Sequence, residues 1–157
     1  MSLTYVRSIT HLLIERRQVM IKDARLGKEL LVTVVNKIGI LAEMSRVLAD
    51  DGLNIEAVAG YAKEGNQAEI ILIADDNVRA RDALVKKGYK SIQERQVVIV
   101  NLENKPGTLK DITAKLAAEG IDIKYIYGTT CSCSAGCPAK IILSTSNNEK
   151  AFASLKK

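Results

Sequence analysis

Apolar and polar positions follow two recurring patterns along this chain, one typical of strands and one typical of helices. Two short runs, residues 30–35 and 97–102, are apolar and β-branched, which favours buried strands. A glycine-containing turn and then apolar residues at helical spacing follow each run. Two further apolar runs come after each helix, and we expect them to pair as hairpins at 55–61 with 68–74 and at 121–127 with 139–145.

The whole pattern occurs twice. Gly39 corresponds to Gly107 at an offset of 68 residues, and glycines, turn residues and apolar positions around them correspond as well. Further along, the offset grows to 71, because three extra residues lie between Gly128 and Ala139. The agreement of several residue classes at one offset indicates an internal duplication. The most similar stretches are Asn36-Lys37-Ile38-Gly39-Ile40-Leu41 and Asn104-Lys105-Pro106-Gly107-Thr108-Leu109.

The order of elements predicts an α+β fold made of two tandem ferredoxin-like βαββαβ sandwiches with antiparallel sheets. Asn77 and Asn148 are expected to cap the second helix of each copy. Both helices of a copy cover one face of its sheet, so the other face needs a second sheet or a partner subunit as cover. We divide the chain into an N-terminal extension (1–28), a first domain (29–94) and a second domain (95–157).

The second copy ends before its own last strand, whereas the first copy has a fourth strand expected at 89–93. Since an open sheet edge is prone to aggregation, a strand from the extension, within residues 12–21, is expected to cover it, within the chain or across a dimer. A helix is the alternative, because Val6, Ile9, Leu13 and Arg17 are also compatible with helical spacing.

Composition excludes several classes of protein. Apolar residues make up 47% of the chain and charged residues 26%, as in proteins with a real core. No apolar run approaches the roughly 20 residues that span a bilayer, and the N-terminus does not resemble a secretory signal, so we expect a cytoplasmic protein. The net charge is +5, but there is no Trp and one Phe, so the aromatic platforms of nucleic-acid binding are missing.

Three cysteines form a cluster where the second copy is longer. Cys131, Cys133 and Cys137 are suitable thiolate ligands for Zn²⁺ or another soft metal, although their spacing matches no standard zinc or iron–sulfur signature. A disulfide switch between Cys137 and one of the other two is a second interpretation, and idle thiols are a third. We expect that the protein requires no cofactor, and a soft metal at this cysteine loop is the one candidate.

The turn after the first strand carries a family resemblance. Asn104, Pro106, Gly107 and Leu109, followed by an amphipathic helix and Glu-Gly-Ile-Asp-Ile, resemble the ACT domain, an amino-acid-sensing module. The resemblance covers residues 29–157, although Ile38 replaces the usual proline in the first copy. It implies a stand-alone tandem ACT protein with an amino-acid ligand at the loop between first strand and first helix, against a neighbouring module.

The chemistry of this loop suits such a ligand. A helix N-terminus offers free N–H groups to a carboxylate, glycine allows close approach, and asparagine both donates and accepts. The alternative is that these residues serve only the turn. Asn54 matches a ligand-contacting position of some ACT domains, and Asp122 takes that place in the second copy. The candidate ligand-binding residues are Asn36, Lys37, Ile38, Gly39, Ile40, Asn54, Asn104, Lys105, Pro106, Gly107, Thr108, Leu109 and Asp122.

We therefore expect a regulatory protein, not an enzyme, that senses an amino acid through contacts in a homodimer or with a separately encoded enzyme or regulator. A metal- or redox-responsive protein is the alternative. His11 is the single histidine, and no nucleophile is placed beside it, which leaves few routes to acid–base or covalent catalysis. RNA-recognition modules and small copper carriers share the strand order, but the first strands lack stacking aromatics and the first loop lacks Cys-x-x-Cys.

Overall fold

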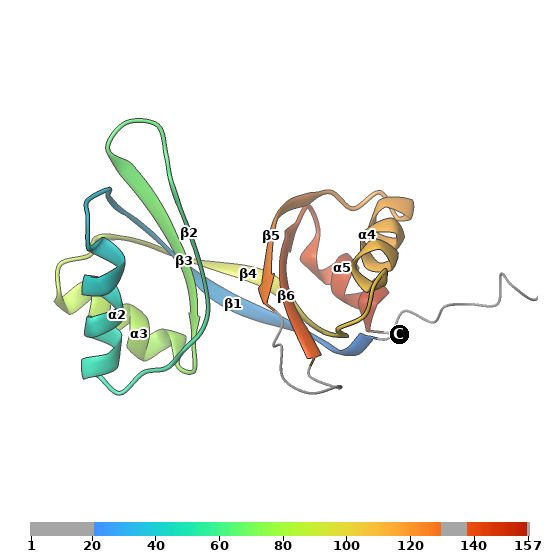
Figure 1. Ribbon diagram of the computed structural model, residues 1–157, viewed down its shortest axis with the longest axis horizontal. Helices are drawn as coiled ribbons and strands as arrows, with labels where there is room; N and C mark the ends of the chain where they lie inside the picture. Colours follow the sequence, from blue (N-terminus) through green and yellow to red (C-terminus); the bar gives the residue numbers. More distant parts are fainter. Residues whose placement is uncertain (1–20, 130–137, 157) are drawn as a thin grey trace, which may run out of the picture.

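The computed structural model describes residues 21–129 and 138–156 (Figure 1). These residues form strands and helices in the order that the duplicated pattern predicts. The elements are β1 (Ile21–Val35), α2 (Ile40–Asp50), β2 (Ile55–Ala62), β3 (Gln67–Ala74), α3 (Asn77–Lys86), β4 (Ser91–Glu103), α4 (Thr108–Ala118), β5 (Ile123–Thr129), β6 (Pro138–Thr145) and α5 (Asn148–Leu155).

The strands form one antiparallel sheet in the order β2-β3-β1-β4-β6-β5. Its two central strands, β1 and β4, are long and pair with each other from Ile21 opposite Leu102 to Thr33 opposite Ser91. We call β2, β3, α2 and α3, with the adjoining halves of β1 and β4, the first module. The second module consists of α4, β5, β6 and α5 with the other halves of β1 and β4. The predicted tandem ferredoxin-like fold is therefore confirmed.

The second module takes its last strand from the start of the described chain. Residues 21–28 of β1 pair with residues 96–102 of β4 and form the last strand of the second module. In the first module, residues 91–94 of β4 form the corresponding last strand. Of the segment expected there, 12–21, only Ile21 lies within the described residues. The strand that completes the second module begins at Ile21 and continues without interruption into the first strand of the first module.

The caps of α3 and α5 differ from the prediction by one residue. The N-caps are Asp76 and Asn147, whose side chains accept hydrogen bonds from first-turn amides. Asn77 and Asn148 instead each join a helix to two strands. The side-chain oxygen of Asn77 accepts from the Ala74 backbone N–H (2.8 Å), and its side-chain nitrogen donates to the Lys28 carbonyl in β1 (2.7 Å). In the same way, Asn148 accepts from the Thr145 backbone N–H (2.8 Å) and donates to the Gln96 carbonyl in β4 (2.6 Å).

Each module has its own core on the helix-covered face of the sheet. In Figure 1 the helices lie at the two outer sides and the strands lie between them. The helix-free faces of the modules meet there, since Ile73 and Ala57 of the first module pack with residues of the second. Thus the cover that the sequence requires for this face is the other half of the same sheet. The residues of the second module in this cluster are Val97, Ile99, Ile142 and Tyr127.

Polar side chains flank this apolar contact between the modules. Glu29 of β1 is fully buried and accepts hydrogen bonds from the hydroxyls of Tyr125 and Tyr127. Elsewhere in the interface, Glu56 of β2 lies 3.6 Å from the ammonium nitrogen of Lys140 in β6. Apolar packing, hydrogen bonds and an ion pair therefore all hold the two modules together.

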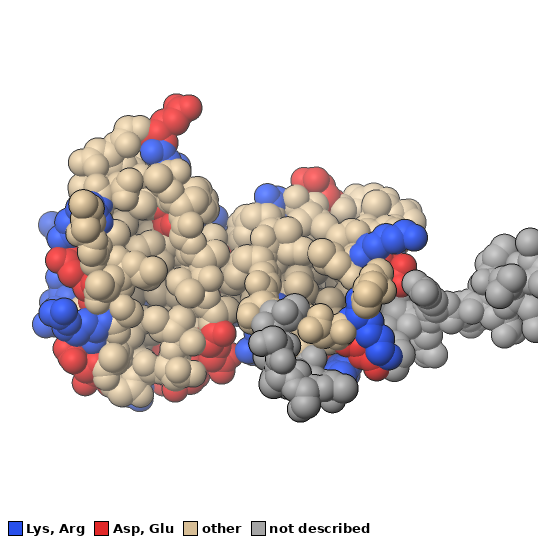
Figure 2. Space-filling view, in the orientation of Figure 1, with Lys and Arg blue, Asp and Glu red and all other residues tan. Residues whose placement is uncertain are grey.

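Charged side chains are distributed unevenly over the surface. In the face shown in Figure 2, lysine, arginine and acidic residues gather toward the outer ends and at the tip of the β2–β3 hairpin, and much of the middle is uncharged. Among the described residues, no helix combines the length and apolar character needed to cross a membrane.

Candidate functional site

The helix that follows the first strand of each module begins without a side-chain cap. Gly39 (φ 89°) precedes α2 and Gly107 (φ 95°) precedes α4, both in the left-handed region that favours glycine. By contrast, Asp76 caps α3 through two first-turn amides. The starts of α2 and α4 therefore retain backbone N–H groups for an outside acceptor, together with the positive end of the helix dipole.

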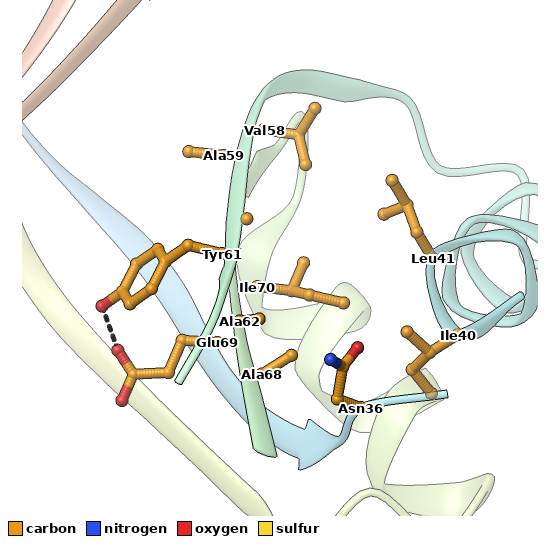
Figure 3. A pocket seen from close by; sticks show the side chains of 11 residues that line it. Asn36, Ile40, Leu41, Val58, Ala59, Tyr61, Ala62, Ala68, Glu69 and Ile70 are labelled. Atoms are coloured by element: carbon orange, nitrogen blue, oxygen red, sulfur yellow. Dashed lines mark hydrogen bonds between the residues drawn. The ribbon is translucent and has the colours of Figure 1, made fainter. Parts of the chain in front are cut away.

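A cavity of about 320 Å³ opens beside the start of α2, between this helix and the edge strand β2 (Figure 3). We call it the first cavity. Two of the predicted ligand-binding residues, Asn36 and Ile40, line it. The remaining lining residues come from the next position of α2 and from the β2–β3 hairpin: Leu41, Val58, Ala59, Gly60, Tyr61, Ala62, Ala68, Glu69 and Ile70.

Three lining residues of the first cavity point away from it. Figure 3 shows Ala59, Tyr61 and Glu69 on the opposite side of the hairpin from Val58, Ile70 and Leu41. The Tyr61 hydroxyl donates to the Glu69 carboxylate, which also accepts from the Lys63 ammonium at 2.9 Å. These two bonds lower the pKa of Glu69, and the bond to Glu69, with burial, raises the pKa of Tyr61. Glu69 is thus held as a carboxylate on the face turned away from the cavity.

A second cavity, of about 410 Å³, lies on the other side of the start of α2, toward the α3–β4 loop. Lys37 and Ile40, both predicted ligand-binding residues, line it, but Lys37 is paired with Glu43 at 2.9 Å. Tyr89 also lines it, and burial, followed by the charge of Glu43, raises the pKa of this phenol. Ile40 therefore separates two cavities that flank one helix start.

The other predicted residues of the first copy lie outside both cavity linings. Ile38 is fully exposed at the tip of the turn. Asn54 joins its loop to the β3–α3 turn, since its amide donates to the Asp75 side chain at 3.2 Å and its carbonyl accepts from the Asp75 amide at 3.1 Å. Both bonds are made by the backbone of Asn54, and ligand contact by its side chain stays a prediction.

The predicted residues of the second copy line neither cavity. Asn104, Pro106 and Leu109 are exposed. Lys105 pairs with Glu103 at 2.6 Å, and the Thr108 hydroxyl donates to the Lys105 carbonyl at 3.1 Å. Asp122 resembles Asn54 in its backbone bonds, because its amide donates to the Ser146 hydroxyl and its carbonyl accepts from the Ser146 amide.

The cysteine loop lies outside the described residues. Metal binding or redox chemistry at Cys131, Cys133 and Cys137 therefore stays a prediction. Within residues 21–129 and 138–156, no group of three histidine, cysteine or acidic side chains is placed to hold a metal ion.

Comparison with known proteins places this arrangement in a family. A family model described as an ACT domain pair matches residues 26–155. The chain belongs to the ACT domain family. The match spans both modules and includes the strand residues from Leu26 onward that complete the second one. The predicted resemblance is therefore confirmed, and the chain is a regulatory ACT module pair.

Several solved structures share the fold of this ACT domain pair. Protein BT0572 from Bacteroides thetaiotaomicron is 28% identical with a TM-score of 0.74, over 85% of this chain and 88% of that one. The ligand-free regulatory subunit of aspartate kinase from Thermus thermophilus is 15% identical with a TM-score of 0.58, over 86% and 95%. The corresponding subunit from Thermus flavus is 14% identical with a TM-score of 0.53, over 87% and 96%. No curated protein matches the chain in sequence.

The far wall of the first cavity is the part that sequence reasoning missed. Val58, Gly60 and Ala62 of β2 line it, together with Ile70 of β3. Gly60 is one of the positions that recur at the 68-residue offset, as Gly128, so the repeat itself contained a signal. What the pattern could not indicate is that β2 stands at the sheet edge with this face open toward α2.

Proposed function

We propose that this ACT domain pair binds a free amino acid in the first cavity and acts as a sensor for a separately encoded enzyme or regulator. The observation that supports this most is the cavity of about 320 Å³ at an uncapped helix start, with Asn36 at its edge. Small-molecule pockets begin at roughly this volume. The α-carboxylate of the ligand is expected at the amides of α2, where the helix dipole favours an anion.

The ligand would act by favouring one assembly over another. A ligand shifts an equilibrium only as far as its affinities for the two states differ. Since the cavity opens at the edge strand β2 and is bordered by the half-exposed Leu41 and Val58, a neighbouring subunit can complete it. A homodimer whose stability depends on the ligand is the proposed output.

The fold supports a regulatory role without a reaction of its own. Aspartate kinase regulatory subunits share this fold, and by analogy we propose that the chain regulates a separate catalytic or DNA-binding partner in the cytoplasm.

The test is a thermal-shift screen of the twenty amino acids on the full chain, followed by calorimetry on any ligand found. We expect one amino acid, or a few similar ones, to raise the Tm. Asn36→Ala is expected to abolish the shift, and Asn104→Ala, the corresponding change in the second copy, to leave it intact. Sedimentation of the full chain with and without this ligand measures the dimer. If no amino acid binds, the proposal is wrong.

A further inference from the structure

The side chains that point into the first cavity are apolar, with one exception. Among the residues labelled in Figure 3, Ile40, Leu41, Val58 and Ile70 point into the space between α2 and the hairpin, and Asn36 lies at its edge. The one charged lining residue, Glu69, points to the opposite face, where Tyr61 and Lys63 satisfy its carboxylate. A charged side chain in this space would lose water without gaining a partner.

The two modules differ in the space above corresponding glycines. A Cβ atom built on Gly60 would meet its nearest neighbours, the Glu69 carbonyl oxygen and Ile70 Cγ1, at 3.6 and 3.9 Å. Built on Gly128, it would lie 2.5 Å from Ile141 Cδ1 and 2.8 Å from the Lys140 carbonyl oxygen. The Ile141 side chain of the second module thus occupies space that stays open beside Gly60.

Two apolar positions that border this space are alike in the two modules, so the environment of the glycine is a difference that they do not explain. Leu41 and Leu109 are 49% and 47% exposed, and Val58 and Ile126 are 48% and 41% exposed. In the first module, two half-exposed apolar side chains therefore border an open space, which an apolar group would fill with a gain from burial. In the second module, the same two positions border a packed strand.

We infer, on the basis of the proposed function, that the ligand is an amino acid with an apolar side chain and that it binds in the first module. Its side chain lies beside Gly60, between Leu41 and Val58. Its carboxylate and ammonium groups lie toward Asn36 and the amides at the start of α2.

Calorimetry on the full chain with each amino acid tests the ligand class. Valine, leucine, isoleucine, methionine or phenylalanine is expected to bind best, at least roughly ten-fold more tightly than aspartate, glutamate, lysine or arginine, as expected when the wrong side chain leaves an unpaired charge. If a charged amino acid binds best, the inference is wrong and the proposed sensor stands. If no amino acid binds, the inference and the proposed function both fail.

A matched pair of variants tests the location. Val58→Asp places a carboxylate at the cavity and is expected to weaken binding at least roughly ten-fold, while Ile126→Asp, at the corresponding position of the second module, leaves it unchanged. Gly60→Ala, which meets no clash in the free protein, repeats the test if Val58→Asp does not fold, and it should weaken large apolar ligands most. Loss of binding in Ile126→Asp with retention in the first-module variants would overturn the inference.

Discussion

Glu29 is the residue whose change should most directly test the contact between the modules. Its carboxylate is fully buried. One oxygen accepts from the Tyr125 hydroxyl and the other from the Tyr127 hydroxyl, the latter at 2.8 Å. Glu29 lies where β1 passes from one module to the other, and Arg95 stands opposite it on β4. The contact joins β1 to β5, strands that are not neighbours in the sheet.

Glu29→Gln keeps the size of the side chain and removes one acceptor. A hydrogen bond to an ionised group contributes about 1.5–3 kcal/mol, and a neutral one about 1 kcal/mol. The variant loses one bond of the first kind and weakens the other, so the free energy of unfolding should fall by about 2–3 kcal/mol. Tyr127→Phe, which leaves a buried carboxylate oxygen without its donor, should reduce it by about 1–3 kcal/mol.

The assay is urea unfolding followed by circular dichroism, with both single variants and the double variant. Because both changes act on the hydrogen bonds of the same carboxylate, the cycle should give a coupling energy of about 1–2 kcal/mol. Glu94→Gln is the control, since the exposed Glu94–Lys28 pair, at 2.6 Å, should contribute less than about 1 kcal/mol. If Glu29→Gln is as stable as the parent chain, or if the coupling energy is zero, the buried contact does not stabilise the interface.

Three further predictions concern pH, the repeated glycines and the shared strand. Burial, and then the bond to Glu29, raises the pKa of Tyr127, so its contribution to stability is complete below about pH 10 and is lost as the pH rises further. In an alkaline titration, tyrosinate absorbance should appear together with unfolding, and the loss of stability with pH should be less steep in Tyr127→Phe. Gly128→Ala should lower the free energy of unfolding by about 1–3 kcal/mol through overpacking, whereas Gly60→Ala should change it by less than about 1 kcal/mol. Equal effects of the two changes in urea unfolding would contradict the difference in space beside the two glycines. Leu26 is partly buried against the core of the second module, so Leu26→Asp should cost about 2 kcal/mol and shift NMR signals of the second module first. The exposed Val85→Asp should change stability by less than about 0.5 kcal/mol, and a uniform loss of signals in Leu26→Asp would argue against an independent second core.

The elements with strong apolar patterns could be predicted from the sequence. Residues 30–35 and 97–102 do lie in strands, and the hairpins and helices of both copies follow as expected. The lengths of β1 and β4 could not be predicted in this way. The stretch around Gly27 and the polar run Glu94-Arg95-Gln96 both interrupt the apolar pattern. They continue as strand because each pairs with the other across the β1–β4 ribbon, a contact between distant parts of the chain.

The lining of the first cavity could be predicted only in part, for a similar reason. Asn36 and Ile40 belong to a local motif, the turn before α2, and both line the first cavity. Val58 and Gly60 line it because β2 lies beside α2 in space, which no local pattern indicates. The buried Glu29 was missed because a glutamate in a polar stretch suggests an exposed position. Its tyrosine partners lie almost a hundred residues away.

The placement of the cavity relative to the module contact gives a physical basis for regulation by this fold. The β2–β3 hairpin forms the wall of the first cavity with one face, through Val58 and Ile70. Its other face contributes Ile73 to the packing between the modules. If the proposed ligand holds this hairpin in one position, it also fixes part of the surface on which the second module packs, and a shared element of this kind can couple two sites. Among the second-module residues that pack with Ile73 in this contact are Ile142 of β6 and Tyr127 of β5, so the hairpin connects the cavity directly to the neighbouring module.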